Sequence, residues 1–104
     1  MPWPLVSVVI PTQRVRRALL QRAVRGVLDQ DYPGPIECLV VFDRSKPEVP
    51  SVETREARVL RVFNNTRASG PSGKRNTGAM AAGGEFLAFC DDDDEWLENK
   101  LRYR

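Results

Sequence analysis

The 104-residue sequence lacks the features that mark several classes of protein. No apolar run approaches the roughly 18 residues that suggest a membrane-spanning helix. The opening stretch MPWPLVSVV has no basic segment followed by a long apolar one, so we predict no signal peptide. Only two cysteines are present, Cys38 and Cys90, and both lie inside apolar runs, which excludes a disulfide framework. These absences predict a cytoplasmic protein, with peripheral association with a membrane as an alternative.

The charges nearly balance, but the two signs are unevenly distributed along the chain. There are 16 basic and 14 acidic residues, and 41% of all residues are hydrophobic, which is typical of one globular domain. No aromatic residues are interleaved with the early arginines, so we predict that these arginines solvate a helix face and bind no nucleic acid. The early arginines are Arg14, Arg16, Arg17, Arg22 and Arg25.

Apolar patterns typical of strands and helices alternate along the chain. Residues at three- and four-residue spacing predict an amphipathic helix at 15–28, and small residues at 74–82 predict a helix that packs closely on a sheet. Residues 44–56 are polar and include two prolines, which predicts a loop. Short runs rich in Val, Ile, Leu and Phe predict buried strands at 5–10, 36–42, 58–63 and 85–90.

This alternation predicts an α/β fold with a mainly parallel four-stranded sheet flanked by helices. The first strand is expected to stop at Pro11, because proline lacks a backbone N–H group. The carboxyl ends of parallel strands meet at one edge, and ligands of open α/β sheets bind there. We therefore expect Pro11, Thr12, Asp43 and residues 91–94 to converge at that edge.

The stretch FCDDDDEW, at 89–96, places four aspartates directly after the last predicted strand. Alternate side chains of extended backbone share a face, so Asp91 and Asp93 are expected to point into one cleft, where their charges repel. A hard cation, Mg²⁺ or Mn²⁺, relieves that repulsion and completes its coordination shell with phosphate oxygens. The alternative is a solvated loop or the start of an amphipathic helix through Trp96, Leu97 and Leu101. A buried strand behind the aspartates favours the metal site.

Two other ion-binding motifs do not fit the sequence. An EF-hand loop in the acidic run requires glycine at its sixth position, which is Trp96. A Walker loop ending at Lys74 requires Gly and then Ser or Thr at positions occupied by Ala68 and Arg75. The segment SGPSGKRNTG still combines flexible backbone, two cations and a helix start, which suits a diphosphate. A loop with surface cations is the alternative interpretation.

Taken in order, SVVIPT, LDQDYP, IECLVVFDRS, SGKRNTG and GEFLAFCDDDDEWLENKL resemble the N-terminal, nucleotide-sugar-binding half of family 2 glycosyltransferases. The resemblance extends from about residue 5 to 101. It implies a Rossmann-like half of the GT-A fold, an inverting sugar transfer from a nucleoside-diphosphate sugar, and Mg²⁺ or Mn²⁺ as cofactor. A UDP-sugar is the favoured donor, and the acceptor is not indicated.

The resemblance also implies roles for individual residues. Asp93 corresponds to the direct metal ligand of a D-x-D motif, with Asp91 as a second ligand. Asn76 and Gly78 belong to the family motif A-R-N-x-G, in which either a structural or a binding role is open. Residues implied to contact the nucleotide sugar are Pro11, Thr12, Asp43, Lys74, Arg75, Asp91 and Asp92.

The sequence departs from the family pattern in two places. Phe42, Asp43 and Arg44 stand where the family usually has two acids and a glycine, which puts the contacts of the base and ribose in doubt. Eleven residues follow Asp93, so we expect residues 1–104 to form a single nucleotide-sugar-binding domain that ends before the acceptor-binding half and its general base.

Because of these departures, functions other than sugar transfer are also considered, and association with another chain is expected. A binding module that holds a nucleotide or nucleotide-sugar without turnover is the main alternative to an enzyme. A nucleotidyltransferase is disfavoured, because no glycine-rich signature follows Pro11. We expect self-association or pairing with a C-terminal half, since a sheet edge without its usual cover invites association.

Overall fold

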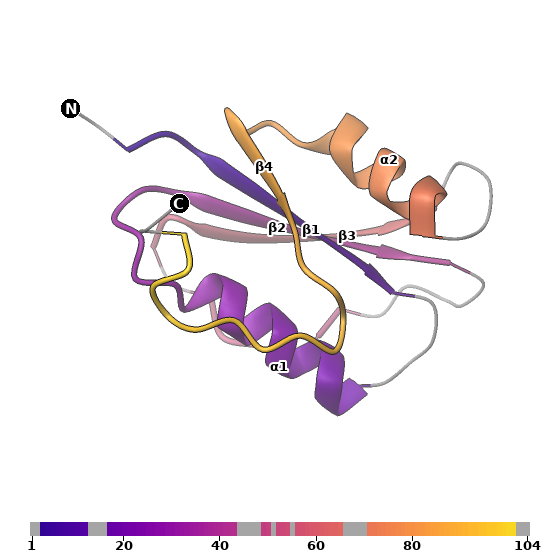
Figure 1. The fold of residues 1–104 in the computed structure, drawn as a ribbon, viewed down its shortest axis with the longest axis horizontal. Coiled ribbons are helices and arrows are strands. Elements are labelled where there is room, and N and C mark those ends of the chain that lie inside the picture. The colour runs from indigo at the N-terminus through magenta and orange to yellow at the C-terminus, as the bar shows by residue number, and fades with distance from the viewer. Residues whose placement is uncertain are drawn as a thin grey trace.

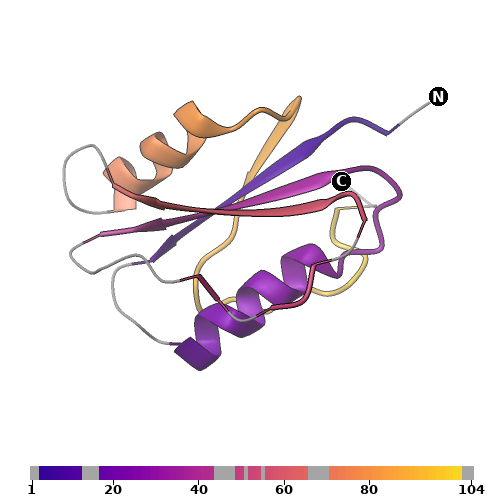
Figure 2. The same cartoon turned by 180° about the vertical axis from the view of Figure 1, so that it is seen from behind.

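The computed structural model describes residues 3–12, 17–43, 49–50, 52–54, 56–65 and 71–101. Four parallel strands form one sheet in the order β3-β2-β1-β4. Figure 1 shows α1 and α2 on opposite faces of this sheet, and Figure 2 shows the same layers from behind. The predicted parallel α/β architecture is therefore confirmed. In chain order the elements are β1 (Val6–Thr12), α1 (Arg17–Leu28), β2 (Ile36–Phe42), β3 (Arg58–Asn64), α2 (Pro71–Ala81) and β4 (Phe86–Phe89).

β1 continues past the point where the sequence predicted its end. Pro11 and Thr12 remain paired with β2, so the expectation that Pro11 stops the strand is wrong. The Thr12 carbonyl accepts a bond from the Asp43 N–H on the β2 side, and Pro11 therefore faces the β4 side. There, β4 pairs with β1 only as far as Val9. The missing N–H of Pro11 consequently removes no ladder hydrogen bond.

The helices also differ slightly from the predicted ranges. α2 begins at Pro71 rather than in the middle of the glycine-rich motif, because proline suits the first helical position, where an N–H has no partner. Gly78 has a structural role in α2, since a Cβ there would collide with the Val9 side chain. In α1, Arg22 and Arg25 are exposed as predicted. Arg14, Val15 and Arg16 lie outside the described residues.

The core lies on both faces of the sheet. Leu20, Val24 and Val27 of α1 pack on the larger face, together with the alternate residues of the strands and both cysteines, which are free and buried. The smaller face, under α2, is formed by Val9, Leu39 and Val41. β1 and β2 are thus buried on both sides, as their continuous apolar runs predicted.

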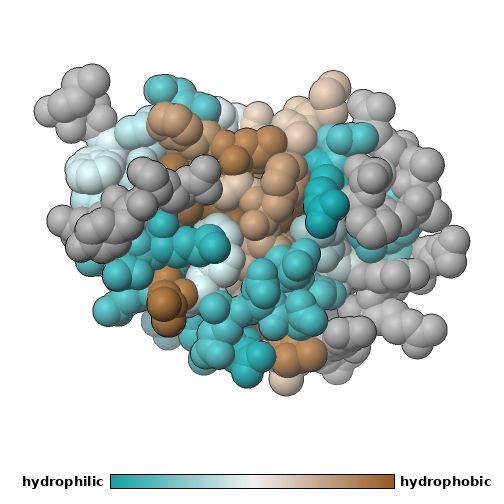
Figure 3. Space-filling model, viewed as in Figure 1, coloured by the Kyte–Doolittle hydropathy of each residue, from teal (hydrophilic) through white to brown (hydrophobic). Residues whose placement is uncertain are grey.

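β4 lies at one edge of the sheet, as β3 does at the other, and three of its four residues are exposed. We expected it to be buried, but Phe86 is 55% exposed, Leu87 40% and Phe89 44%. Figure 3 shows apolar side chains gathered over this part of the surface. Within the described part of the chain, β4 pairs with β1 alone. Its outer side, which we call the β4 edge, is therefore buried only if another segment or molecule covers it.

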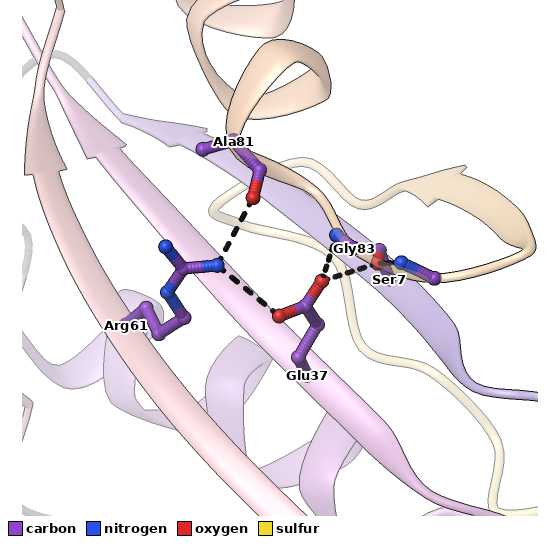
Figure 4. A network of polar contacts seen from close by, with 6 residues as sticks. Ser7, Glu37, Arg61, Ala81 and Gly83 are labelled. Atoms are coloured by element: carbon purple, nitrogen blue, oxygen red, sulfur yellow. Dashed lines mark hydrogen bonds and ion pairs between the residues drawn. The ribbon is translucent and has the colours of Figure 1, made fainter.

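A polar network ties the end of α2 and the start of β4 to the sheet (Figure 4). The Glu37 carboxylate accepts hydrogen bonds from Ser7 Oγ at 2.6 Å, Gly83 N at 2.5 Å and Arg61 Nη1 at 3.2 Å. Arg61 also donates to the Ala81 carbonyl at the end of α2, at 3.0 Å. Burial alone raises the pKa of Glu37, but these bonds outweigh it and lower the pKa. The network fixes where α2 ends and where β4 begins.

The segment after the aspartates is held by Gln30 instead of forming the alternative helix. The fully buried Gln30 amide donates to the Leu97 carbonyl at 2.6 Å and accepts from Leu101 N at 2.8 Å. Residues 91–101 form turns rather than an α-helix. The acidic run therefore lies between β4 and a segment anchored on the end of α1. Neither helix in the described part of the chain has both the length and the apolar character needed to cross a membrane.

Candidate functional site

The carboxyl ends of β1, β2 and β3 are joined by backbone hydrogen bonds that continue past the strands. Asp43 N donates to the Thr12 carbonyl at 3.1 Å, and Asn65 N donates to the Phe42 carbonyl at 2.7 Å. These bonds hold Thr12, Asp43 and Asn65 side by side at one edge of the sheet. The predicted convergence at this edge is therefore present for β1 and β2.

Thr12 connects this edge to the acidic run. Its side chain is buried, and its hydroxyl donates to Asp92 Oδ2 at 2.8 Å, although 80 positions separate the two residues. Pro11, one position earlier, is half-buried. Thr12 thus contacts Asp43 through its backbone and Asp92 through its side chain. This is how the ends of β1, β2 and β4 meet.

The acidic run brings three carboxylates close together. Ligand oxygens of Asp91, Asp93 and Asp94 lie within 4.8 Å of one another, and all three side chains are exposed. Hard oxygen donors with an open side suit Mg²⁺ or Mn²⁺, which keep coordination positions for water and phosphate. Asp91 and Asp93 were both predicted as ligands. Asp94 was not predicted to join them, because alternation along an extended strand does not apply to the turn that the chain makes here.

Two cations of α2, Lys74 and Arg75, were predicted to contact a nucleotide, and their surroundings in the structure differ from each other. Arg75 Nη2 lies 3.9 Å from Asp91 Oδ1, and the Arg75 guanidinium lies over the Phe89 ring at 5.9 Å. Arg75 therefore lies beside the three carboxylates of Asp91, Asp93 and Asp94, which we call the acidic cluster. Lys74 is buried, 4% exposed, in the first turns of α2. No hydrogen bond or ion pair joins it to another predicted site residue within the described ranges. Asn76 is exposed.

Asp43 is buried and contacts Asn65, which in turn contacts Thr77, and the sequence analysis assigned neither of these two residues. Asn65 Nδ2 donates to Asp43 Oδ1 at 3.5 Å, and Thr77 Oγ1 donates to Asn65 Oδ1 at 2.7 Å. Asn65 follows β3 just as Asp43 follows β2, so the rule for carboxyl ends could have found it. Thr77 had no such signal, because its contact depends on how α2 lies over the sheet.

Cys90 separates β4 from the acidic run without contributing a reactive group. Burial, followed by the negative charges of Asp94 and Asp91, raises the pKa of its thiol to about 12. The thiol therefore stays protonated at neutral pH, and a protonated thiol is a poor nucleophile and a poor metal ligand.

Comparison with known proteins identifies relatives over most of the chain. The family model for glycosyl transferase family 2 matches residues 7–103. The GalNAc(5)-diNAcBac-PP-undecaprenol beta-1,3-glucosyltransferase of Campylobacter jejuni is 35% identical over 102 residues, covering 94% of this chain and 32% of that protein. WfgD of Escherichia coli, a UDP-Glc:alpha-D-GlcNAc-diphosphoundecaprenol beta-1,3-glucosyltransferase, is 34% identical over 99 residues, covering 93% and 38%. The chain thus spans about a third of the length of these curated relatives.

Two solved structures resemble the fold described above. The mannosyltransferase PcManGT from Pyrobaculum calidifontis, solved in complex with GDP-Man and Mn²⁺, has a TM-score of 0.73 and 29% identity, covering 89% of this chain and 28% of that one. S. aureus TarS has a TM-score of 0.71 and 26% identity, covering 94% and 18%. These likenesses confirm the GT-A type of α/β fold that the sequence predicted.

Proposed function

The chain belongs to glycosyl transferase family 2, and on that premise we propose that its carboxyl edge binds a nucleoside-diphosphate sugar through a divalent cation. The observation that carries the proposal is the meeting of Thr12, Asp43 and the acidic cluster, from three strands, at one edge. The bond from the buried Thr12 hydroxyl to Asp92 favours this proposal over the alternative of a solvated acidic loop, in which the carboxylates would bond only to water.

Asp91, Asp93 and Asp94 are the residues proposed to hold Mg²⁺ or Mn²⁺. The cation, when bound, neutralises the diphosphate and stabilises the charge that develops on it as the sugar departs. Asp92 is directed toward Thr12, so we assign it a positioning role and contacts with ribose or sugar rather than direct ligation. The Mn²⁺ in the PcManGT complex supports a metal of this class.

Arg75 and Lys74 are proposed to contact the diphosphate. Arg75 pairs with Asp91 at 3.9 Å, and both side chains are largely exposed, so solvent weakens this pair and a phosphate oxygen can replace the carboxylate as partner. Lys74 lies near the start of α2, where the helix dipole also favours an anion. Pro11 and Thr12 border the nucleotide, and Asp43 is assigned to the base.

We propose a UDP-sugar as the donor and an inverting transfer. The donor named in WfgD, UDP-Glc, supports the first part. For the acceptor we propose a lipid-linked saccharide at a membrane surface, because two relatives act on undecaprenol diphosphate-linked acceptors. We propose that residues 1–104 form a single donor-binding domain. No residue of this domain is assigned as the general base.

The experiment that tests donor binding is a calorimetric titration with UDP, in the presence and absence of Mn²⁺. The variants are Asp93→Ala and, as a matched control, Asp29→Ala, which removes an exposed aspartate at the end of α1. We expect metal-dependent binding that Asp93→Ala abolishes and Asp29→Ala leaves unchanged. Binding that ignores Mn²⁺, or that survives in Asp93→Ala, would contradict the proposed metal site.

A further inference from the structure

A hydrogen-bonded chain, Thr77–Asn65–Asp43, connects α2 to the edge of the sheet at which the nucleotide is proposed to bind. Thr77 lies on the sheet-facing side of α2 and is 7% exposed. Its hydroxyl is 2.7 Å from Asn65 Oδ1, and Asn65 Nδ2 is 3.5 Å from Asp43 Oδ1. Thr77 belongs to α2 and the Asp43 N–H is bonded to the Thr12 carbonyl of β1, so the chain is fixed at both ends by regular structure.

The chemistry of these groups determines which end of the Asn65 amide faces Asp43. A carboxylate only accepts hydrogen bonds, so the amide nitrogen must be the end that turns toward it. The amide oxygen then faces α2, where the Thr77 hydroxyl donates to it. The two ends of an amide have nearly the same shape, and only their partners hold one orientation. The Asp43 carboxylate sets the orientation, and the Thr77 hydroxyl, which donates to the amide oxygen, holds the side chain in that position.

We propose that Thr77, together with the Asp43 carboxylate, holds the Asn65 amide in place, so that Asn65 and Asp43 present a donor beside an acceptor and select a nucleobase whose ring N–H adjoins a carbonyl. This inference rests on the proposed function, in which Asp43 contacts the base. Uracil, its 5-methyl derivative thymine, and guanine belong to this class, and uracil and guanine are the two that the test below uses. Thr77 and Asn65 are thus positioning and specificity-determining residues, outside the metal cluster.

The selection follows from matching donors to acceptors. Uracil and guanine each offer a ring N–H to the Asp43 carboxylate and an adjacent carbonyl oxygen to the Asn65 amide. Cytosine and adenine have a bare ring nitrogen at that position, and two acceptors facing each other cost the energy of an unmade hydrogen bond. Those bases can offer their amino group to Asp43 only by shifting along the edge, which moves the ribose and diphosphate away from the acidic cluster.

The test compares four nucleotides in calorimetric titrations with Mn²⁺ present: UDP, GDP, CDP and ADP. Wild-type protein is expected to bind UDP or GDP at least about tenfold more tightly than CDP and ADP. Thr77→Val keeps the side-chain shape but removes the hydroxyl, and is expected to lower this ratio at least about threefold. Thr77→Ser, which keeps a hydroxyl, and Thr54→Val, at an exposed threonine elsewhere, are expected to preserve the ratio.

Thermal unfolding of each variant separates folding from selection, because a purely structural role changes the melting temperature without changing the ratio between nucleotides. If Thr77→Val does not fold, Asn65→Asp serves as a second variant. It replaces the donor with an acceptor of equal shape and should weaken UDP and GDP relative to CDP and ADP.

The outcomes distinguish this inference from the function on which it rests. Metal-dependent binding without preference among the bases, or with a preference that survives Thr77→Val and Asn65→Asp, overturns the inference and leaves donor binding intact. Failure of the wild-type protein to bind any of the four nucleotides overturns both. Loss of the preference in Thr77→Val together with its return in Thr77→Ser supports the inference.

Discussion

The replacement Glu37→Gln tests the network that holds α2 and β4 in place. The Glu37 side chain is 10% exposed, and one of its oxygens accepts from Ser7 at 2.6 Å and from Gly83 at 2.5 Å. A glutamine oxygen can keep these two bonds but loses the charge that strengthens them, a difference of about 0.5–1 kcal/mol for each bond. Arg61, itself 40% exposed, adds no more than about 1 kcal/mol because of solvent screening.

The expected loss in the free energy of unfolding is therefore about 2 kcal/mol at pH 7. Urea denaturation should show a lower midpoint with an unchanged slope, since the surface exposed on unfolding is the same. The melting temperature should fall by roughly 10 °C, given the size of the domain. Glu53→Gln, at an exposed position, serves as the control and should change stability by less than about 0.5 kcal/mol.

The pH dependence gives a sharper form of this prediction. The pKa of Glu37 is lowered in the folded state, so its stabilisation is present above the unfolded pKa and is lost as the pH falls through the folded one. The stability gap between wild type and Glu37→Gln should therefore narrow as the pH falls below about 4.5. A midpoint equal to that of the wild type at pH 7, or a gap that stays constant in acid, would refute the reasoning.

Three further predictions concern the candidate site, the connection between α1 and β2, and the exposed edge strand β4. Thr12→Val removes the bond to Asp92 and should weaken UDP binding in Mn²⁺ by roughly three- to tenfold in calorimetry; unchanged affinity would speak against the role of Thr12 as a link. Arg58→Met leaves the carbonyls of the α1–β2 connection without their donor and should cost at least about 3 kcal/mol in urea denaturation, and a loss below about 1 kcal/mol contradicts this. The exposed β4 edge should make the protein self-associate at high concentration, and Phe86→Lys should reduce this in light scattering; a monomeric wild type rules the prediction out.

Several features of the fold and site followed from local sequence pattern. A nearly continuous apolar run predicted β2 with its observed bounds, because a strand buried on both faces has few polar positions, and Glu37 is the exception here. The parallel arrangement then required Thr12 and Asp43 to meet at one edge, whatever the details of the loops. The sequence also placed the acidic run at this edge, since that run follows a strand of the same sheet.

Other features depended on contacts that local pattern does not encode. The exposure of Phe89 follows from the position of β4 at the edge, which strand order decides and an apolar run does not reveal. The strand beyond Pro11 depends on where β4 stops pairing. The bond between the Thr77 hydroxyl and the Asn65 amide depends on the packing of α2 over the sheet, which brings the two side chains within 2.7 Å. The sequence by itself thus determined which chemical groups reach this edge, and the tertiary structure decided how they are oriented, because orientation is set by partners distant in the chain.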